Sequence, residues 1–598
     1  MKKIIKNIGN LKDLFALVGK GSAFAILFFL ISSMLESGFP LLIAYFNKIL
    51  LAKLETVGSD LHIIIAMVCT VTAVSFVKKV LTMVFSYVRA YISSGINFTL
   101  KQKLYEKCER LPLRIFDDPS IYDRLVIAER LSSGAVTDIA TGIFKFISGL
   151  VQYFFGCFIL ASFSPWLLWA PIVASLTGFI EGRRSLSYED FDKRRTGFVR
   201  RMDYFKTITT QGFFTKEIKV NGMRDYTTAR YNEYNKKWNS EEMQYSLSTQ
   251  RVSLLLYPLR ELVIFVLPAV FFVRLVSNGE ITIADFSYYI SMLTICHSAL
   301  NDLVNQHFSR MISSIRIRDY MDFMTYGEEE RNGRSIPMEW LKASPAIEFC
   351  DVSFRYSGSK HNAVDRVNLF LAPGEHITII GENGAGKTTL IKLLCGLYEP
   401  SEGKILIDGI DSREFAQKEL YQLFSVVFQD YATYEATLRD TLSMGSVVTD
   451  DEIIIGLNKL EQSKEDNIFS HVFNCDLSTK LGKTISHNGL SLSGGENQKL
   501  ALARALIQSR SIAILDEATA SLDAYAEMNM LRCFAEERQG KTTVMISHRI
   551  GSAKMCNRIL VLSNGRIVED GTHNQLINNA GAYAKLYATQ AGAYRDNN

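Results

Sequence analysis

Long apolar stretches recur through the first half of the chain and stop near residue 320. Six of them are candidates to cross a bilayer, which takes about 20 consecutive apolar residues in a helix. They cover residues 23–46, 61–84, 142–163, 167–180, 254–276 and 283–303. The mean hydropathy of +0.08 is high for a wholly soluble chain and low for a wholly membrane one. The sequence therefore predicts an all-α membrane half followed by a water-soluble half.

Basic residues are distributed unevenly between the connections that join these stretches. Residues 89–130 carry eight Lys and Arg, residues 183–237 carry fourteen, and the turns 164–166 and 277–279 carry none. Cytoplasmic loops of membrane proteins have an excess of Lys and Arg. We therefore expect a multi-pass protein of the plasma (inner) membrane whose two termini and long connections are cytoplasmic.

The two long connections have apolar residues at helical spacing, which favours spans that continue as helices into the cytoplasm. Each pair of extended helices would turn through a short helix, at residues 116–123 and 213–218. Pro119 after Asp118 fits the start of the first of these helices. The alternative is that both connections are solvated loops.

Several ionisable residues lie within or near the spans, where a charge facing lipid is costly. Glu36, Arg260, Glu261 and His297 are candidates for a polar substrate cavity, and pairing between helices explains them equally well. For Lys78, Lys79, Lys145, Glu181, Arg274 and Asp302 we favour pairing or a position near the membrane edge.

Composition excludes some classes of function. The formal net charge of +4 gives no sign of a nucleic-acid partner. The nine cysteines are scattered, without a CxxC pair or a Cys/His cluster at zinc spacing. We therefore expect reduced structural thiols rather than a disulfide framework or a metal centre.

A charged, turn-rich segment at residues 326–345 interrupts the pattern and is predicted to be a linker. It separates a transmembrane domain, residues 1–325, from a second domain, residues 346–598. The second domain begins with strand-like alternation at residues 346–354. Its length is sufficient for a separate α/β domain with its own core.

A glycine-rich loop follows the short apolar strand at residues 377–380. Residues 381–389 read GENGAGKTT and match GxxxxGK[ST], and a helix is predicted directly afterwards. Glycines allow backbone N–H groups to converge on phosphate oxygens, and the helix N-terminus adds its dipole. Lys387 would reach the β- and γ-phosphates, and the Thr388 hydroxyl would bind Mg²⁺.

A second apolar strand, residues 512–515, ends in Asp516 and Glu517. An acidic residue at this place beside a phosphate loop is suited to hold Mg²⁺, which assigns Asp516 to the metal. Glu517 is then the candidate general base for the attacking water. The alternative is that both acids are present only because a helix N-terminus favours acidic residues.

Residues 492–496, LSGGE, precede a predicted helix at residues 497–507 and form a second anion-binding helix start. A chain with one phosphate loop has no need of it in its own site, so we expect it to complete the site of another copy. A third strand ends at His548, where an imidazole would contact a γ-phosphate.

These motifs, in this order, resemble those of ATP-binding cassette (ABC) exporters in their half-transporter form, including bacterial peptide, bacteriocin and multidrug exporters. The resemblance covers essentially the whole chain. It implies that Tyr356 stacks on adenine, that Gln429 binds Mg²⁺ and senses the membrane domain, and that Asp523 belongs to the D-loop. Residues 482–489 depart from the multidrug pattern, which leaves details of coupling open.

The resemblance implies Glu517, His548, Gln429 and Lys387 as catalytic residues, and Thr388, Gln429 and Asp516 as metal ligands. The implied ATP-binding residues are Tyr356, Gly381, Glu382, Asn383, Gly384, Ala385, Gly386, Lys387, Thr388, Thr389, Ser493, Gly494, Gly495, Glu496 and Asp523.

With six spans and one copy of each motif, the resemblance implies a dimer. We expect a homodimer, and a heterodimer with a second subunit is the alternative. It implies ATP-driven export of a peptide or amphipathic small molecule by alternating access, with ATP and Mg²⁺ as cofactors. Residues 116–125 and 215–222 are similar to coupling regions of peptide exporters. A lipid or lipid-linked-sugar flippase, or an ATP-gated channel or membrane regulator, are the alternatives.

Overall fold

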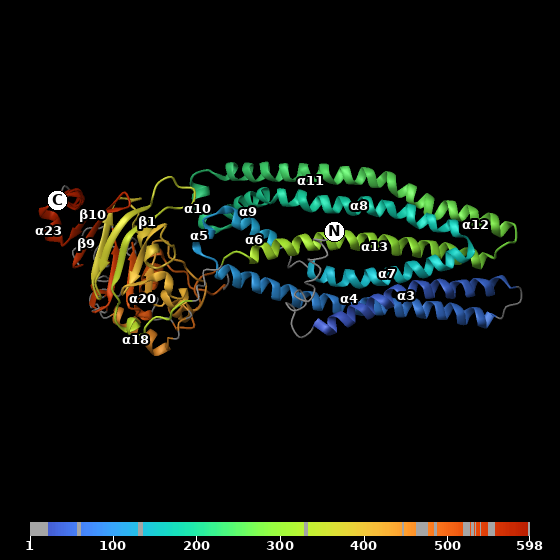
Figure 1. The fold of residues 1–598 in the computed structure, drawn as a ribbon, viewed down its shortest axis with the longest axis horizontal. Coiled ribbons are helices and arrows are strands. Elements are labelled where there is room, and N and C mark those ends of the chain that lie inside the picture. Colours follow the sequence, from blue (N-terminus) through green and yellow to red (C-terminus); the bar gives the residue numbers. More distant parts are fainter. Residues whose placement is uncertain are drawn as a thin grey trace. The chain divides into compact units, whose positions relative to one another are not determined.

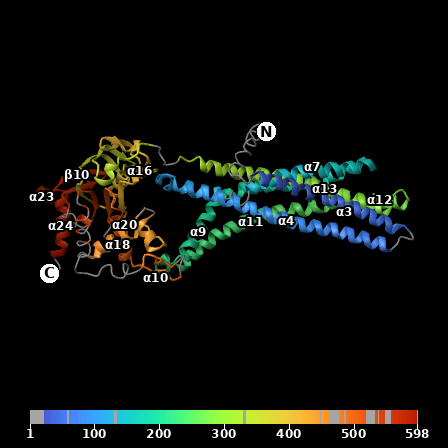
Figure 2. The same ribbon diagram turned by 90° about the horizontal axis from the view of Figure 1, so that it is seen from below.

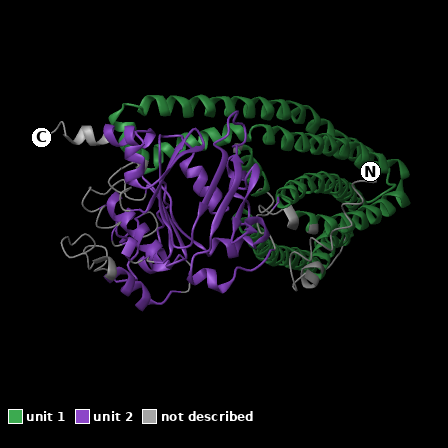
Figure 3. Cartoon of the chain, turned by 60° about the vertical axis from the view of Figure 1, so that its left-hand side comes forward, with its two compact units in different colours: residues 1–109, 118–326 green, residues 110–117, 327–598 purple. Residues whose placement is uncertain are grey.

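A computed structural model (Figures 1 and 2) describes most of the chain. The described residues are 22–56, 61–129, 135–327, 333–444, 446, 448–461, 476–483, 487–517, 527, 532, 534–536, 538, 540–547 and 556–595. They form two compact units (Figure 3). Unit 1 contains residues 1–109 and 118–326, and unit 2 contains residues 110–117 and 327–598.

Unit 1 is built from long helices that lie alongside one another (Figure 1). These are α3 (Ser22–Glu55), α4 (Leu61–Glu109), α7 (Ala135–Phe163), α8 (Trp169–Arg194), α11 (Arg224–Glu261) and α13 (Ile283–Met324). The π-helical turn η3 (Leu262–Val266) joins α11 to α12 (Leu267–Ser277). At 49 residues, α4 is about 73 Å long at 1.5 Å per residue. The prediction that spans continue as helices beyond the bilayer is thus confirmed.

Short helices make the predicted turns of the two long connections. In the first, α6 (Pro119–Glu129) begins at Pro119, as predicted, and Asp118 accepts hydrogen bonds from the backbone and hydroxyl of Ser120. In the second, α10 (Gly212–Val220) contains the predicted residues 213–218. The first connection also contains α5 (Leu113–Phe116), which belongs to unit 2, and the second contains α9 (Thr196–Thr210). The turn between α7 and α8 is η2 (Pro165–Leu168).

Among the described helices, α3, α4 and α7 are long and apolar enough to cross a membrane by length and composition. The other three predicted spans are less apolar for identifiable reasons. The apolar part of α8 is short and is followed by charged residues, and the fifth span is interrupted at η3 beside Arg260 and Glu261. The sixth contains His297 and Asp302.

Small residues allow α7 to approach α13 closely. Gly142, Gly149 and Gly156 recur every seven residues on α7. A Cβ at Gly142 would collide with Gln306, and one at Gly156 with the Sγ of Cys296. Close backbone approach through small residues is a common basis of helix association in membranes.

Buried charges connect α8 with its neighbours outside the apolar region. Glu189, 4% exposed, binds Arg316 of α13 through two hydrogen bonds of 3.1 and 2.9 Å. Arg195, 2% exposed, lies over the rings of Phe191 and Trp238 and donates to Glu242 of α11. Because both side chains are shielded from water, removing the partner of either one leaves a charge without a compensating ion pair, which destabilises the fold.

We predict that Glu189→Ala lowers the free energy of unfolding by about 1–3 kcal/mol, since it removes charged hydrogen bonds from a guanidinium that is only partly exposed. Glu233→Ala is the matched control, because Glu233 binds Arg230 and Lys237 at the surface and such pairs contribute little. Thermal unfolding of the two variants in the same detergent measures the difference. Equal midpoints would contradict the prediction.

Unit 2 contains two sheets. The antiparallel sheet has the order β2–β1–β4–β5, and the second sheet the order β10–β9–β3–β8–β7–β6, parallel from β9 to β6. The strands are β1 (Ile347–Phe354), β2 (Val364–Leu371), β3 (His376–Gly381), β4 (Glu402–Ile407), β5 (Ile410–Asp411), β6 (Phe424–Val427), β7 (Ile512–Asp516), β8 (Thr542–Ile546), β9 (Arg558–Ser563) and β10 (Arg566–Gly571). The predicted strands at residues 346–354, 377–380 and 512–515 correspond to β1, β3 and β7.

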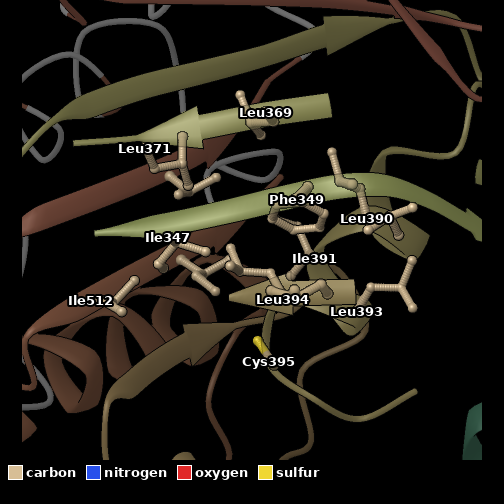
Figure 4. Packing of buried hydrophobic residues seen from close by; sticks show 14 of the residues in the cluster. Ile347, Phe349, Leu369, Leu371, Leu390, Ile391, Leu393, Leu394, Cys395 and Ile512 are labelled. Atoms are coloured by element: carbon tan, nitrogen blue, oxygen red, sulfur yellow. The ribbon is translucent and has the colours of Figure 1, made fainter. Parts of the chain in front are cut away.

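Helix α15 (Lys387–Leu394) packs into the main core of unit 2. Figure 4 shows Leu390, Ile391 and Leu394 of this helix close to Phe349 of β1. The remaining described helices are α14 (Met338–Lys342), η4 (Ser412–Glu414), α16 (Gln417–Tyr421), α17 (Leu438–Ser443), α18 (Asp450–Glu461), α20 (Gly494–Gln508), α23 (His573–Asn578) and α24 (Ala582–Arg595). The apolar face of α15 fixes the loop before it against the sheets.

Candidate functional site

The strand order of the parallel sheet places the predicted chemistry at one edge. β8 lies between β3 and β7, and all three are parallel, so their carboxyl ends meet at the same edge. The phosphate loop follows β3, and Asp516 and Glu517 end β7. Residue 547 follows β8, while the predicted His548 lies outside the described residues. Ligands bind at this edge in open α/β sheets.

The phosphate loop requires glycine at particular positions. Gly384 and Gly386 have φ of 80° and 101°, in the region that residues with a side chain rarely adopt. A Cβ at Gly381 would collide with the carbonyl of Leu562, and one at Gly386 with that of Ala363. Gly386 is also the N-cap of α15 and offers no side chain to cap it. The backbone N–H groups of this helix start are therefore suited to phosphate oxygens.

Lys387 is folded back across the loop. Its Nζ donates to the carbonyl oxygens of Gly381 and Glu382, at 2.9 and 3.0 Å, and the residue is buried. Burial lowers the pKa of Lys387, while Glu517 and Asp516 oppose that shift. The ammonium is held by carbonyls, so a phosphate can replace them as its partner.

Asp516 is fully buried. The Thr388 hydroxyl lies beside its carboxylate, but neither oxygen has a well-formed hydrogen bond within the described part of the chain. Burial raises the pKa of Asp516, and Glu517 adds to the rise, while Thr388 and Lys387 oppose it. Buried polar groups normally have a partner. A carboxylate and a hydroxyl are ligands that suit Mg²⁺, so these residues fit the metal predicted here.

Glu517 has a φ of +48°, which is uncommon for a residue other than glycine and is often found at functional sites. Its N–H donates to the carbonyl of Ile546, at 3.1 Å. Its Oε2 accepts a hydrogen bond from the Nε2 of Gln429, at 2.8 Å. The structure thus brings together two of the predicted catalytic residues, Glu517 and Gln429, beside Asp516.

Tyr356 lies near the other end of the loop. Its hydroxyl is 3.1 Å from that of Thr389, and its ring meets the ring of Tyr398 edge-on at 5.6 Å. Sequence reasoning missed Tyr398, which is nearly fully buried. No local pattern marks it, because its partners are distant in sequence.

The LSGGE segment forms the start of α20. Ser493 is the N-cap, its side chain accepts from the N–H of Glu496, and Glu496 accepts from the N–H of Ser493. This capping box orders the helix start. Gly494 and Gly495 are the first residues of the helix. The predicted D-loop residue Asp523 lies outside the described residues.

The candidate cavity residues of unit 1 are arranged in two places. Glu36 of α3 lies 3.5 Å from Arg89 of α4. Arg260 and Glu261 form an ion pair of 2.7 Å at the end of α11, directly before the π-helical turn. Both act electrostatically on His297 of α13, which also interacts with the backbone of Pro171. Within the described part of the chain, the buried Nδ1 of His297 has no well-formed hydrogen bond. The structure thus brings Arg260, Glu261 and His297 together.

Two family models match this chain: the ABC transporter transmembrane region over residues 22–300, and the ABC transporter model over residues 364–520. The subtilin transport ATP-binding protein SpaT of Bacillus subtilis is 29% identical over 560 residues, which are 92% of this chain and 88% of that protein. An ATP-dependent lipid A-core flippase of Burkholderia pseudomallei is 29% identical over 424 residues, 70% of this chain and 68% of that protein.

The fold also has a solved counterpart. The structure of a bacterial Atm1-family ABC exporter with ATP bound matches with a TM-score of 0.75 at 22% identity, over 96% of this chain and 100% of that chain. The predicted fold, a helical transmembrane domain followed by an ABC nucleotide-binding domain, is confirmed. The chain therefore belongs to the ABC transporter family and is an ATP-hydrolysing exporter with its transmembrane and ATP-binding regions fused in one polypeptide.

Proposed function

We propose that this chain exports a peptide, or an amphipathic molecule of similar character, across the plasma membrane as a homodimer. The proposal that export is driven by ATP is supported by one observation. The phosphate loop, Asp516, Glu517 and Gln429 lie together at one edge of the sheet. Hydrolysis needs a phosphate cradle, a metal ligand and a base for water, and these residues are suited to the three roles.

In the proposed site, ATP lies on the phosphate loop with its adenine against Tyr356. Thr388, Asp516 and Gln429 hold Mg²⁺, which would neutralise charge on the phosphates. Lys387 exchanges its carbonyl partners for phosphate oxygens, and Glu517 accepts a proton from the attacking water. Residues 493–496 of a second copy complete the site, with Asp523 and His548 in the roles that the sequence predicts.

ATP binds the closed dimer better than the open one and so shifts a two-state equilibrium. Residues 1–325 and 346–598 are the proposed domains, joined by the linker 326–345. Both termini lie in the cytoplasm in this proposal. The proposed substrate cavity includes Glu36, Arg260, Glu261 and His297. Glu36 pairs with Arg89, and Arg260 pairs with Glu261, which would lower the cost of these charges in a membrane.

The peptide proposal draws on the name of the subtilin transport protein, which this chain matches over 92% of its length. A lipid flippase is the second candidate, because several lipid A-core flippases match over 70% or more of the chain. The two candidates differ in the ligand that should accelerate hydrolysis.

We predict that Glu517→Gln lowers ATP hydrolysis by at least about 100-fold, since it removes the general base, and that ATP binding persists. The measurement uses the full chain in lipid nanodiscs, with Glu536→Gln on the surface as the control. Acceleration of the parent chain by a peptide fraction supports peptide export, and acceleration by lipids alone supports the flippase. Hydrolysis by Glu517→Gln at the parent rate would contradict the proposal.

We predict that Asp516→Asn weakens metal binding to the protein in the presence of ATP, because it removes the only charged side chain among the proposed ligands. Mn²⁺ serves as a paramagnetic probe, and its binding is measured by electron paramagnetic resonance at saturating ATP. ATP affinity in EDTA should stay within about twofold, since the phosphate cradle is intact. Mn²⁺ bound as tightly as by the parent would rule out Asp516 as a ligand.

A third prediction concerns the short segment Arg110–Asp117, which belongs to unit 2 although it directly follows α4. Leu113 packs against the core, and Asp117 accepts a hydrogen bond from the hydroxyl of Tyr398, at 2.9 Å. Tyr398 in turn contacts Tyr356. This segment is therefore suited to carry changes at the nucleotide into α4.

We predict that Tyr398→Phe leaves basal hydrolysis within about twofold and lowers ligand-stimulated hydrolysis roughly three- to tenfold, the effect of one hydrogen bond to a carboxylate at a partly exposed site. Tyr105→Phe is the matched control, because its hydroxyl binds Glu129 within unit 1. Steady-state rates with and without the stimulating ligand give the ratio. An unchanged ratio in Tyr398→Phe would disprove this role.

A further inference from the structure

Tyr431 connects two parts of the candidate site that are distant in sequence. Its hydroxyl donates to the carbonyl oxygen of Gly494, at 3.2 Å, and Gly494 is the first residue of α20. Two residues earlier, Gln429 donates to Glu517. One short segment after β6 therefore contacts both the candidate base and the LSGGE segment.

Three further hydrogen bonds of this helix start are formed between its own residues. Asn497 donates to the carbonyls of Leu492 and Ser493, at 3.3 and 3.2 Å, and Glu496 accepts from Ser493. These bonds order the turn internally and move with it. The bond from Tyr431 is different, because it restrains the turn relative to the sheet edge that carries Glu517.

The ring of Tyr431 is well placed to hold this bond. It is half-buried in the wall of a cavity of about 350 Å³ between residues 431–435 and α20, which Leu492 and Arg504 also line. Burial raises the pKa of Tyr431, so the hydroxyl remains a donor throughout the physiological pH range. The neighbouring Tyr434 lines the same cavity but is exposed.

We propose that Tyr431 is a positioning residue that fixes the LSGGE turn for contact with the ATP of a second copy. This inference rests on the proposed function, in which Ser493 to Glu496 complete the partner's site. In the proposed site Gln429 would help to hold the metal, and it lies two residues before Tyr431 in the same short segment. A change in the contact of Gln429 would therefore reach the carbonyl of Gly494 through Tyr431.

The test measures how long ATP stays in the closed dimer. The full chain in nanodiscs carries Glu517→Gln, so that ATP is retained, and release of radiolabelled ATP is followed after a chase with unlabelled ATP. Tyr431→Phe removes the hydroxyl and keeps the ring. We expect release to become about two- to tenfold faster, the effect of one neutral hydrogen bond, with an unchanged melting midpoint in the absence of nucleotide.

Two further variants separate this inference from the proposed function. Tyr434→Phe, the matched control in the same cavity, should release ATP at the parent rate. Ser493→Ala should accelerate release if the LSGGE turn contacts ATP at all. Acceleration by Ser493→Ala but not by Tyr431→Phe overturns the role of Tyr431 and leaves the composite site intact. Parent-like release from Ser493→Ala overturns the composite site itself, and the role of Tyr431 with it.

Discussion

A buried carboxylate without a hydrogen bond is unfavourable, and the site of this exporter is organised around one. Asp516 lies at the end of a strand whose five residues are all buried, and neither of its oxygens has a well-formed partner among the described residues. Burial raises its pKa, which expresses the same energetic penalty for the charged form. A divalent cation would supply a partner for this carboxylate and so would offset the cost of burying its charge.

The surrounding groups follow from this constraint. Lys387, the nearby cation, is engaged by two carbonyls of its own loop and compensates Asp516 only at a distance. Glu517, the next residue, occupies an uncommon backbone conformation and is held by Gln429. A ligand that brings metal and phosphate together satisfies the aspartate and the lysine at once. Binding and folding of this edge are therefore linked, because a ligand that prefers the folded site stabilises it.

Local patterns predicted much of this arrangement. The phosphate loop, the strands on which it and Asp516 lie, and the helix after LSGGE are continuous in sequence, and the structure places them as expected. Hydropathy identified the helices of the membrane half. It is less decisive for the fifth span, where charges and a π-helical turn interrupt the apolar run. A π turn depends on packing against neighbours, which a single sequence does not reveal.

Contacts between distant segments were beyond prediction. Tyr431 meets Gly494 across 63 residues, and Asp117 meets Tyr398 across 281. The sequence separation of neither pair indicates a contact, because each contact depends on how the sheets and helices of unit 2 pack together. The sequence could assign roles to Gln429 and Glu517, but only the folded chain shows that they form a hydrogen bond with each other.

The glycine spacing on α7 determines how the membrane half can bend. A strict seven-residue repeat is shorter than two full turns of a straight α-helix, so helices that keep such a seam in contact wind around each other with a left-handed twist. Gly142, Gly149 and Gly156 keep this repeat along the face that meets α13. To separate two helices that wind around each other, contacts along the whole length of the pair must be broken. In a transport cycle, α7 and α13 would therefore move together as one rigid unit, and the helices without such a glycine repeat would move relative to them.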